Sequence, residues 1–196
     1  MTGNSNIFGM GYPVAAAVDT YTEGTSITYD TGFVIGTGVE AVLNAETGDN
    51  EDWGDDELQD FDNGLNGING SLELNSLELS KLAQLLGWVS EGSTQVVYHA
   101  TDGESPYFGF GYYFKDVGGY VARWIYRVRF SRGSHTARTK QRNVEWNHPT
   151  LEWRGTVIHL TTPADKGVWH DDTLCTTREA AKAWLNSKAG ISTVGG

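Results

Sequence analysis

The sequence predicts a mainly β protein with minor α structure, and three observations support this fold class. Seven Trp, nine Tyr and seven Phe occur among the 196 residues, and aromatic side chains favour strands. The 25 glycines separate many of the apolar segments, where they favour turns. Several short segments alternate apolar and polar residues, which is the pattern of half-buried strands. Length and apolar content suit a single domain over residues 1–196, with an N-terminal arm at about 1–20.

The region from about 44 to 66 is predicted to be a long acidic loop. It holds nine Asp and Glu residues and no Lys or Arg. A loop of this length in a compact domain is usually functional or disordered. Trp53, Leu58 and Phe61 lie inside it, and these apolar residues indicate that the loop contacts another surface, such as a neighbouring subunit. The acidic residues expected on its surface are Asp49, Glu51, Asp52, Asp55, Asp56, Glu57, Asp60 and Asp62.

A strand and a helix are expected after the acidic loop. Residues 68–75 alternate apolar and polar positions, as a half-buried strand does. Asn75 is the expected N-cap of the helix and Gly87 its C-terminal stop. The helix should pack on the sheet through an apolar stripe of Leu79, Leu82 and Leu86, with Leu85 beside it.

The middle of the chain predicts an antiparallel hairpin with a turn at 116–119. The first strand carries aromatic residues on one face and Gly109 and Gly111 on the other. The return strand is expected to place Trp124, Tyr126, Val128 and Phe130 on one face, and Arg123, Ile125, Arg127 and Arg129 on the other. This pattern predicts an aromatic inner face and a basic outer face.

The last third of the chain predicts two more strands and a second helix. The strands are expected at 144–146 and within 151–160. Thr176 and Glu179 have the spacing of a capping box. The C-terminal helix and tail are therefore expected over about 176–196.

Charge is divided unevenly along the chain. No Lys, Arg or His precedes Lys81, whereas residues 1–80 contain 15 Asp and Glu. Residues 123–154 hold eight basic residues against Glu145 and Glu152, a net charge of +6. Such asymmetry predicts that two surfaces attract each other. The alternative is that solvated loops share one sign of charge without binding anything.

No residue pattern predicts an enzyme, and no cofactor or metal is expected. The five histidines form no i, i+4 pair, and Cys175 is the only cysteine. Asp60 begins a sequence that resembles an EF-hand loop, but Ser71 stands where the bidentate Glu is required. An adventitious Ca²⁺ site in the acidic loop stays open. His170 before two Asp residues is a weak hint of a site, but a polar surface turn is the favoured explanation.

The sequence also predicts where the protein is made. It contains neither the pattern of a signal peptide near Met1 nor an apolar segment long enough to span a membrane. A single cysteine fits a reducing compartment. A soluble protein made in a cytoplasm, with no membrane partner, is expected.

An ordered series of short motifs runs through residues 78–160. A helical segment ends in Leu-Leu-Gly87, and Pro106-Tyr107 opens a glycine-rich strand. A return strand carries Trp-Ile-Tyr126, and Thr139-Lys140 and a Pro-Thr-Leu-Glu-Trp-Arg-Gly155 segment follow. In this order the motifs resemble the major tail protein of long, non-contractile bacteriophage tails, the subunit of the tail tube. The resemblance covers about 120 residues, extends weakly into the C-terminal helix, and is least close in the N-terminal part.

The resemblance implies a tail-tube β-sandwich or half-barrel with one packed helix and a C-terminal helix. It implies a structural virion protein whose hexameric rings stack into the tube that conducts DNA during ejection. The expected partners are further copies of the chain, the tape-measure protein, the tail terminator and the distal tail proteins. Viral DNA would pass through the lumen without sequence-specific binding. The protein would be made in the host cytoplasm and reside in the virion tail.

Two sets of residues follow as hypotheses for the site. Some Asp and Glu residues of the acidic loop are expected to line the lumen, because a basic lumen would retain DNA phosphates. The subunit interface is expected to contain Trp53, Leu58, Phe61, Arg123, Arg127, Arg129, Arg138, Lys140 and Arg142. The alternative function is that of a phage or secreted β-sandwich module that binds carbohydrate or a receptor.

Overall fold

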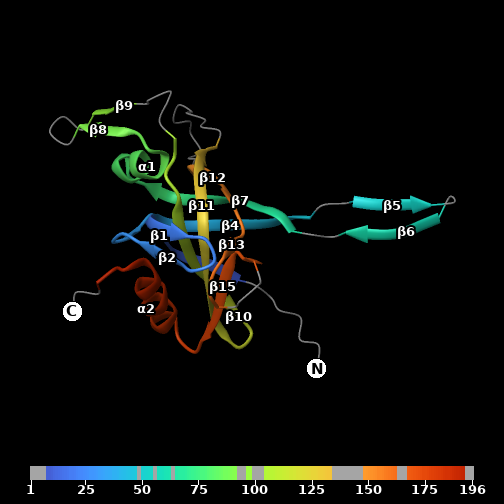
Figure 1. Ribbon diagram of the computed structural model, residues 1–196. Coiled ribbons are helices and arrows are strands. Elements are labelled where there is room, and N and C mark those ends of the chain that lie inside the picture. The colour runs from blue at the N-terminus through green and yellow to red at the C-terminus, as the bar shows by residue number, and fades with distance from the viewer. Residues whose placement is uncertain are drawn as a thin grey trace, which may run out of the picture.

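The computed structural model describes residues 8–47, 50–54, 57–62, 65–91, 96–98, 104–133, 148–162 and 167–192. It confirms a mainly β fold with two helices in the described residues (Figure 1). The elements are β1 (Phe8–Thr22), β2 (Ser26–Tyr29), β3 (Phe33–Val34), β4 (Gly36–Thr47), β5 (Asn50–Gly54), β6 (Glu57–Asp62), β7 (Leu65–Leu77), α1 (Leu79–Leu86), β8 (Val89–Glu91), β9 (Val96–Tyr98), β10 (Phe108–Asp116), β11 (Gly119–Arg132), β12 (Thr150–Gly155), β13 (Ile158–His159), β14 (Gly167–Val168), β15 (His170–Cys175) and α2 (Arg178–Ala189).

The main sheet is antiparallel and curls back on itself. Its strand order is β2-β1-β10-β11-β12-β7-β4, and β3 pairs with β1. Only one residue separates β3 from β4, and the amide of that residue, Ile35, donates a 2.9 Å hydrogen bond to the carbonyl of Pro13 in β1. The chain therefore joins the two ends of the β1-to-β4 path, and closure of this kind leaves less unpaired strand edge. We call this curled sheet the barrel.

Two hydrophobic clusters pack on opposite sides of the barrel wall. The interior cluster contains the aromatic side chains of Phe108, Phe110, Phe130 and Trp153, together with Leu85 from α1. The exterior cluster forms where α2 covers β1, β10 and β11, and it is centred on Trp124 and Leu185. The two helices thus pack on separate parts of the sheet (Figure 1).

A β-bulge in β11 corrects the predicted faces of that strand. Phe108 pairs with Val128, whereas Phe110 pairs with Ile125, so β11 contains one extra residue between the two pairs. An extra residue reverses the alternation of side chains. As a result Ile125 joins the interior cluster with Val128, and Trp124 lies in the exterior cluster. The single basic face predicted for Arg123, Arg127 and Arg129 is therefore wrong, because Arg123 precedes the bulge.

The N-terminal segment is a strand of the barrel instead of an arm. β1 runs from Phe8 to Thr22 and pairs with β10. Val14, Ala15 and Ala16 are fully buried. The expectation of an arm to about residue 20 is wrong from residue 8 onward, since small apolar side chains place this segment inside the fold. Residues 1–7 lie outside the described residues.

The first helix is shorter than the sequence predicts and buries only part of the expected stripe, since Leu86 is buried and Leu82 packs on the interior cluster. Asn75 belongs to β7, and Glu78 occupies the N-cap without a side-chain cap. Gly87 ends the helix in the left-handed conformation at φ 68°, as expected. Leu79 is 52 % exposed, whereas Leu85 is fully buried. Because the helix has only eight residues, its docking on the barrel and not its apolar periodicity decides which side chains are buried.

The second helix begins one residue later than the capping-box spacing predicts. The Thr177 hydroxyl accepts a 3.1 Å hydrogen bond from the amide of Ala180, which makes Thr177 the N-cap. The helix ends at Ala189, before Gly190 in the left-handed conformation. The strand expected at 144–146 lies outside the described residues, and the region 151–160 forms β12 and β13.

The acidic segment is a β-hairpin extension instead of an irregular loop. β4 and β7 pair from Gly36 and Leu77 to Thr47 and Leu65. Beyond them β5 and β6 form their own two-stranded ladder, which projects far from the barrel (Figure 1). In the described residues β5 and β6 have no strand partner except each other. We call β5 and β6 the distal hairpin.

Candidate assembly surface

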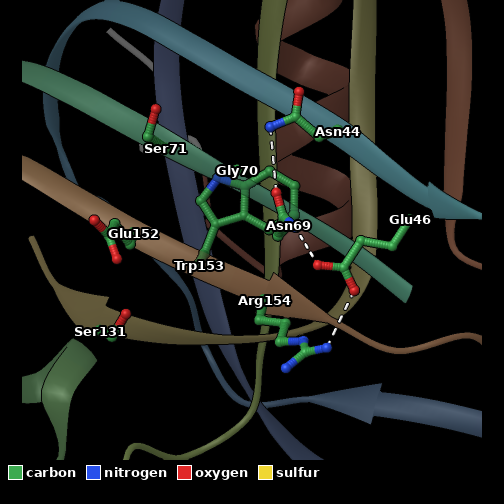
Figure 2. A pocket seen from close by; sticks show the side chains of 9 residues that line it. All are labelled: Asn44, Glu46, Asn69, Gly70, Ser71, Ser131, Glu152, Trp153 and Arg154. Atoms are coloured by element: carbon green, nitrogen blue, oxygen red, sulfur yellow. Dashed lines mark hydrogen bonds and ion pairs between the residues drawn. The ribbon is translucent and has the colours of Figure 1, made fainter. Parts of the chain in front are cut away.

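The outward side of β4, β7 and β12 is a polar wall. Residues directly opposite each other on antiparallel strands share one side of the sheet. Asn44 lies opposite Asn69, and Asn69 lies opposite Arg154. In the next row Ser71 lies opposite Glu152. A shallow groove of about 430 Å³ follows this wall and is lined by Asn44, Glu46, Asn69, Ser71, Glu152 and Arg154 (Figure 2).

A chain of hydrogen bonds crosses the wall from strand to strand (Figure 2). Asn44 Nδ2 donates to Asn69 Oδ1 at 3.2 Å, and Asn69 Nδ2 donates to Glu46 Oε1. Arg154 Nη2 then donates to Glu46 Oε2 at 3.1 Å. The floor of the groove is Gly70, which lies opposite Trp153. Such a network holds polar side chains in place on an open surface.

Three arginines lie close together along this wall, and we call them the arginine cluster: Arg127, Arg129 and Arg154. Arg127 and Arg129 both stack on the ring of Tyr107, with guanidinium carbons 3.8 and 4.1 Å from the ring centre. Arg127 also lies 4.9 Å from the ring centre of Tyr21. Arg129 lies directly opposite Arg154. The cluster therefore joins β11 and β12 on the outward side of the barrel.

Arg123 belongs to a different surface, on the far side of the bulge. Its guanidinium donates two hydrogen bonds to Asp172, at 2.7 and 2.6 Å. His170 Nε2 lies 3.5 Å from the same carboxylate. Burial alone would raise the pKa of Asp172, but the hydrogen bonds and charges of Arg123 and His170 hold that pKa well below its usual range. His170, the weak hint of a site in the sequence, therefore belongs to an ion-paired contact between β11 and β15.

The apolar residues predicted for the interface occupy related register positions in the distal hairpin. Trp53 lies opposite Leu58, and Phe61 lies opposite Glu51. Asp52 lies opposite Asp60 in the intervening row. A register shift lies between the Asp52 and Trp53 rows, so the apolar and acidic residues of the hairpin follow each other at neighbouring register positions. The structure therefore assigns both predicted properties of the segment, apolar and acidic, to one projecting element.

Several predicted site residues lie outside the described residues. They are Arg138, Lys140 and Arg142 of the expected interface, and Asp49, Asp55 and Asp56 of the expected acidic surface. The remaining acidic residues of that prediction, Glu51, Asp52, Glu57, Asp60 and Asp62, lie in β5 and β6.

Sequence reasoning missed Tyr107, Tyr21 and the Asn44–Asn69–Glu46 chain. These residues come together only through strand pairing, and no local motif marks them. Alternation along 68–75 did place Asn69 on the polar side of its strand, which was the one available signal.

In the part of the chain that the structure describes, no group of three or more His, Cys, Asp or Glu side chains could hold a metal ion. No described helix is both long enough and apolar enough to cross a membrane. A scan against models of protein families gave no match for the chain, and neither did a search of curated proteins. The surface geometry and the sequence motifs are therefore the observations on which a function can be argued.

Proposed function

We propose that this protein is a structural subunit that assembles with copies of itself, as the tail-tube subunit of a long, non-contractile bacteriophage tail. Hexameric rings would stack into a tube around a tape-measure protein, and viral DNA would later pass through the lumen. The motifs at residues 78–160 support the choice of this family, and the barrel with its projecting hairpin is the physical argument for self-assembly.

The distal hairpin is the observation that carries the proposal. An isolated two-stranded hairpin is marginally stable in water at best. β5 and β6 pair only with each other in the described residues and project from the barrel (Figure 1). Apolar residues at Trp53, Leu58 and Phe61 add to the free energy that burial against a partner would release. A second copy of the chain offers such a partner at the same concentration as the hairpin itself.

Strand closure also supports a structural role. The barrel pairs most of its own strands, so a copy can present defined surfaces without exposing a long flat edge to uncontrolled pairing. The outward wall of polar side chains, held by the chain from Asn44 to Arg154 (Figure 2), is suited to a wetted lumen or a subunit contact. Head-to-tail contacts between copies generate a closed ring when the rotation from one copy to the next closes.

Negative-stain electron microscopy of the purified protein over a range of concentrations tests the proposal. We expect rings or tubes of uniform diameter for the full chain. A variant in which residues 48–64 are replaced by an Asn-Gly turn keeps the β4–β7 ladder and should remain monomeric. A full chain that stays monomeric at every concentration would contradict the proposal, and glycan binding by that monomer would favour the carbohydrate-binding alternative.

A further inference from the structure

The arginine cluster concentrates positive charge in a way that the described chain does not fully balance. Arg129 and Arg154 lie directly opposite each other on paired strands, and like charges in that position destabilise a sheet. Glu104 lies 2.9 Å from Arg129, and Glu46 lies 3.1 Å from Arg154. In the described residues Arg127 has no acidic partner.

The surroundings of Arg127 hold its guanidinium in place without neutralising its charge, which suits the binding of an anion. Its guanidinium stacks on Tyr107 and on Tyr21, with distances of 3.8 and 4.9 Å to the ring centres. Its Nε is buried and has no hydrogen-bond acceptor among the described residues. A buried donor without an acceptor costs about 1–3 kcal/mol, and arginine presents its donors in a fork that matches a carboxylate. The Nε of Arg129 is buried and unpaired in the same way.

We propose that the arginine cluster binds the carboxylates of the distal hairpin of a second copy of this chain. This inference rests on the proposed self-assembly and specifies the two surfaces that meet. Asp52 and Asp60 lie opposite each other in the hairpin, and Asn50 lies opposite Asp62, so carboxylates are concentrated at neighbouring register positions. A chain's own hairpin projects away from the barrel that carries its arginines (Figure 1). The carboxylates must therefore come from another copy.

Nucleic acid is the competing anion, and the charges of the chain disfavour it. The protein has a formal net charge of −11, which repels a phosphate backbone at long range. Glu46, Glu104 and Glu152 also stand beside the three arginines. A short acidic segment needs only a few unbalanced donors, whereas a duplex needs a broad basic surface. The hairpin carboxylates therefore fit this small cluster better.

A charge exchange between two full-length variants tests the pairing. The first variant, Arg129→Glu/Arg154→Glu, changes the two more exposed arginines, whose side chains are 40 % and 75 % exposed. The second variant, Asp52→Lys/Asp60→Lys, reverses the charge at two positions of the distal hairpin. Each variant alone brings like charges together, so the concentration needed for self-association should rise about tenfold or more, which corresponds to about 1.4 kcal/mol. An equimolar mixture restores both attractive contacts and should associate near the wild-type concentration.

Matched controls separate this contact from general charge effects. Lys115→Glu/Arg178→Glu makes the same change of charge at two exposed positions away from the cluster and should associate like the wild type. Arg127→Gln removes the unpaired cation with little change of shape and should also weaken association. Near-ultraviolet circular dichroism of each dilute variant verifies that its barrel is folded. Sedimentation velocity measures association at every size from dimer to tube.

Each outcome decides at least one of the two proposals. Association of both exchanged variants at the wild-type concentration, or a mixture that does not recover, overturns the hairpin–arginine contact. Wild-type association that stops at dimers without rings overturns the tail-tube function but leaves the contact testable by the exchange. No association of the wild type at any concentration overturns both. Retained assembly together with loss of duplex DNA binding in Arg129→Glu/Arg154→Glu overturns the contact in favour of nucleic acid.

Discussion

The indole ring of Trp124 lies beside Gly111, its direct partner on the neighbouring strand. A Cβ atom added at Gly111 would stand 2.7 Å from Trp124 Cε3 and 2.7 Å from Leu185 Cδ2. The glycine therefore makes room for both a tryptophan of β11 and the helix α2 above it. The same arrangement recurs where Trp153 lies opposite Gly70. Aromatic–glycine pairs thus fix the register of two strand pairs.

We expect Gly111→Ala to destabilise the protein by about 1–3 kcal/mol, because an added methyl group in a packed site forces neighbouring side chains from their preferred positions. Urea unfolding followed by tryptophan fluorescence measures the change. Gly118→Ala is the matched control, since its Cβ would meet only Leu174, at 3.7 Å and beyond. The control should shift stability by less than about 0.5 kcal/mol, and an equal loss in both variants would contradict the packing argument.

The Arg123–Asp172 pair predicts a loss of stability in acid. The pKa of Asp172 is held below its usual range in the folded protein. Its contribution is therefore fully present above about pH 4 and is lost as the pH falls from there towards the folded-state pKa. Because the Asp172 side chain is 35 % exposed, solvent screening limits the contribution to about 1 kcal/mol.

Urea unfolding of the wild type and of Asp172→Asn between pH 3 and pH 7 measures this contribution. The two free energies of unfolding should differ at pH 7 and converge as the pH falls. A difference that stays constant over this range would show that the carboxylate charge is not involved.

Tyr29 predicts the opposite behaviour in alkali. Burial raises the pKa of Tyr29, and its hydroxyl donates a 2.8 Å hydrogen bond to the carbonyl of Tyr126. The folded state therefore favours the protonated phenol, so stability is present below about pH 10 and is lost as the pH rises above it.

Replacing Tyr29 by Phe should cost about 1 kcal/mol at pH 7 and reduce the alkaline loss. Absorbance at the phenolate wavelength during a pH titration, together with urea unfolding, measures both effects. Tyr98→Phe is the control, because Tyr98 is 53 % exposed and its replacement should leave the free energy of unfolding unchanged. Titration of Tyr29 with the exposed tyrosines would refute the prediction.

The first helix predicts a contrast between two leucines. Leu85 is fully buried in the interior cluster, whereas Leu79 is 52 % exposed. Leu85→Ala should therefore cost about 2–5 kcal/mol, and Leu79→Ala less than about 0.5 kcal/mol. Thermal unfolding measured by circular dichroism compares them. A larger loss of stability in Leu79→Ala than in Leu85→Ala would contradict this contrast and would favour the stripe expected from the sequence.

Local patterns predicted much of the fold correctly. Alternation identified β7 as a strand with one buried face, and it also identified β10, where aromatic residues alternate with glycines although both faces are buried. Gly87 was recognised as a helix stop, because few residues other than glycine adopt the left-handed conformation readily. The caps failed at Asn75 and Thr176, since a cap depends on where packing begins the helix and not on residue type alone.

The sequence by itself determined the mainly β class, the two helices, and the separation of acidic and basic residues along the chain. Only the tertiary structure decided that one extra residue in β11 sends Arg123 and Arg127 to opposite sides of the sheet. It also decided that Arg129 meets Arg154 and that Tyr107 lies against two guanidinium groups. Composition and alternation are properties of a single strand, whereas register, bulges and cross-strand contacts arise from pairing between segments that are distant in the sequence.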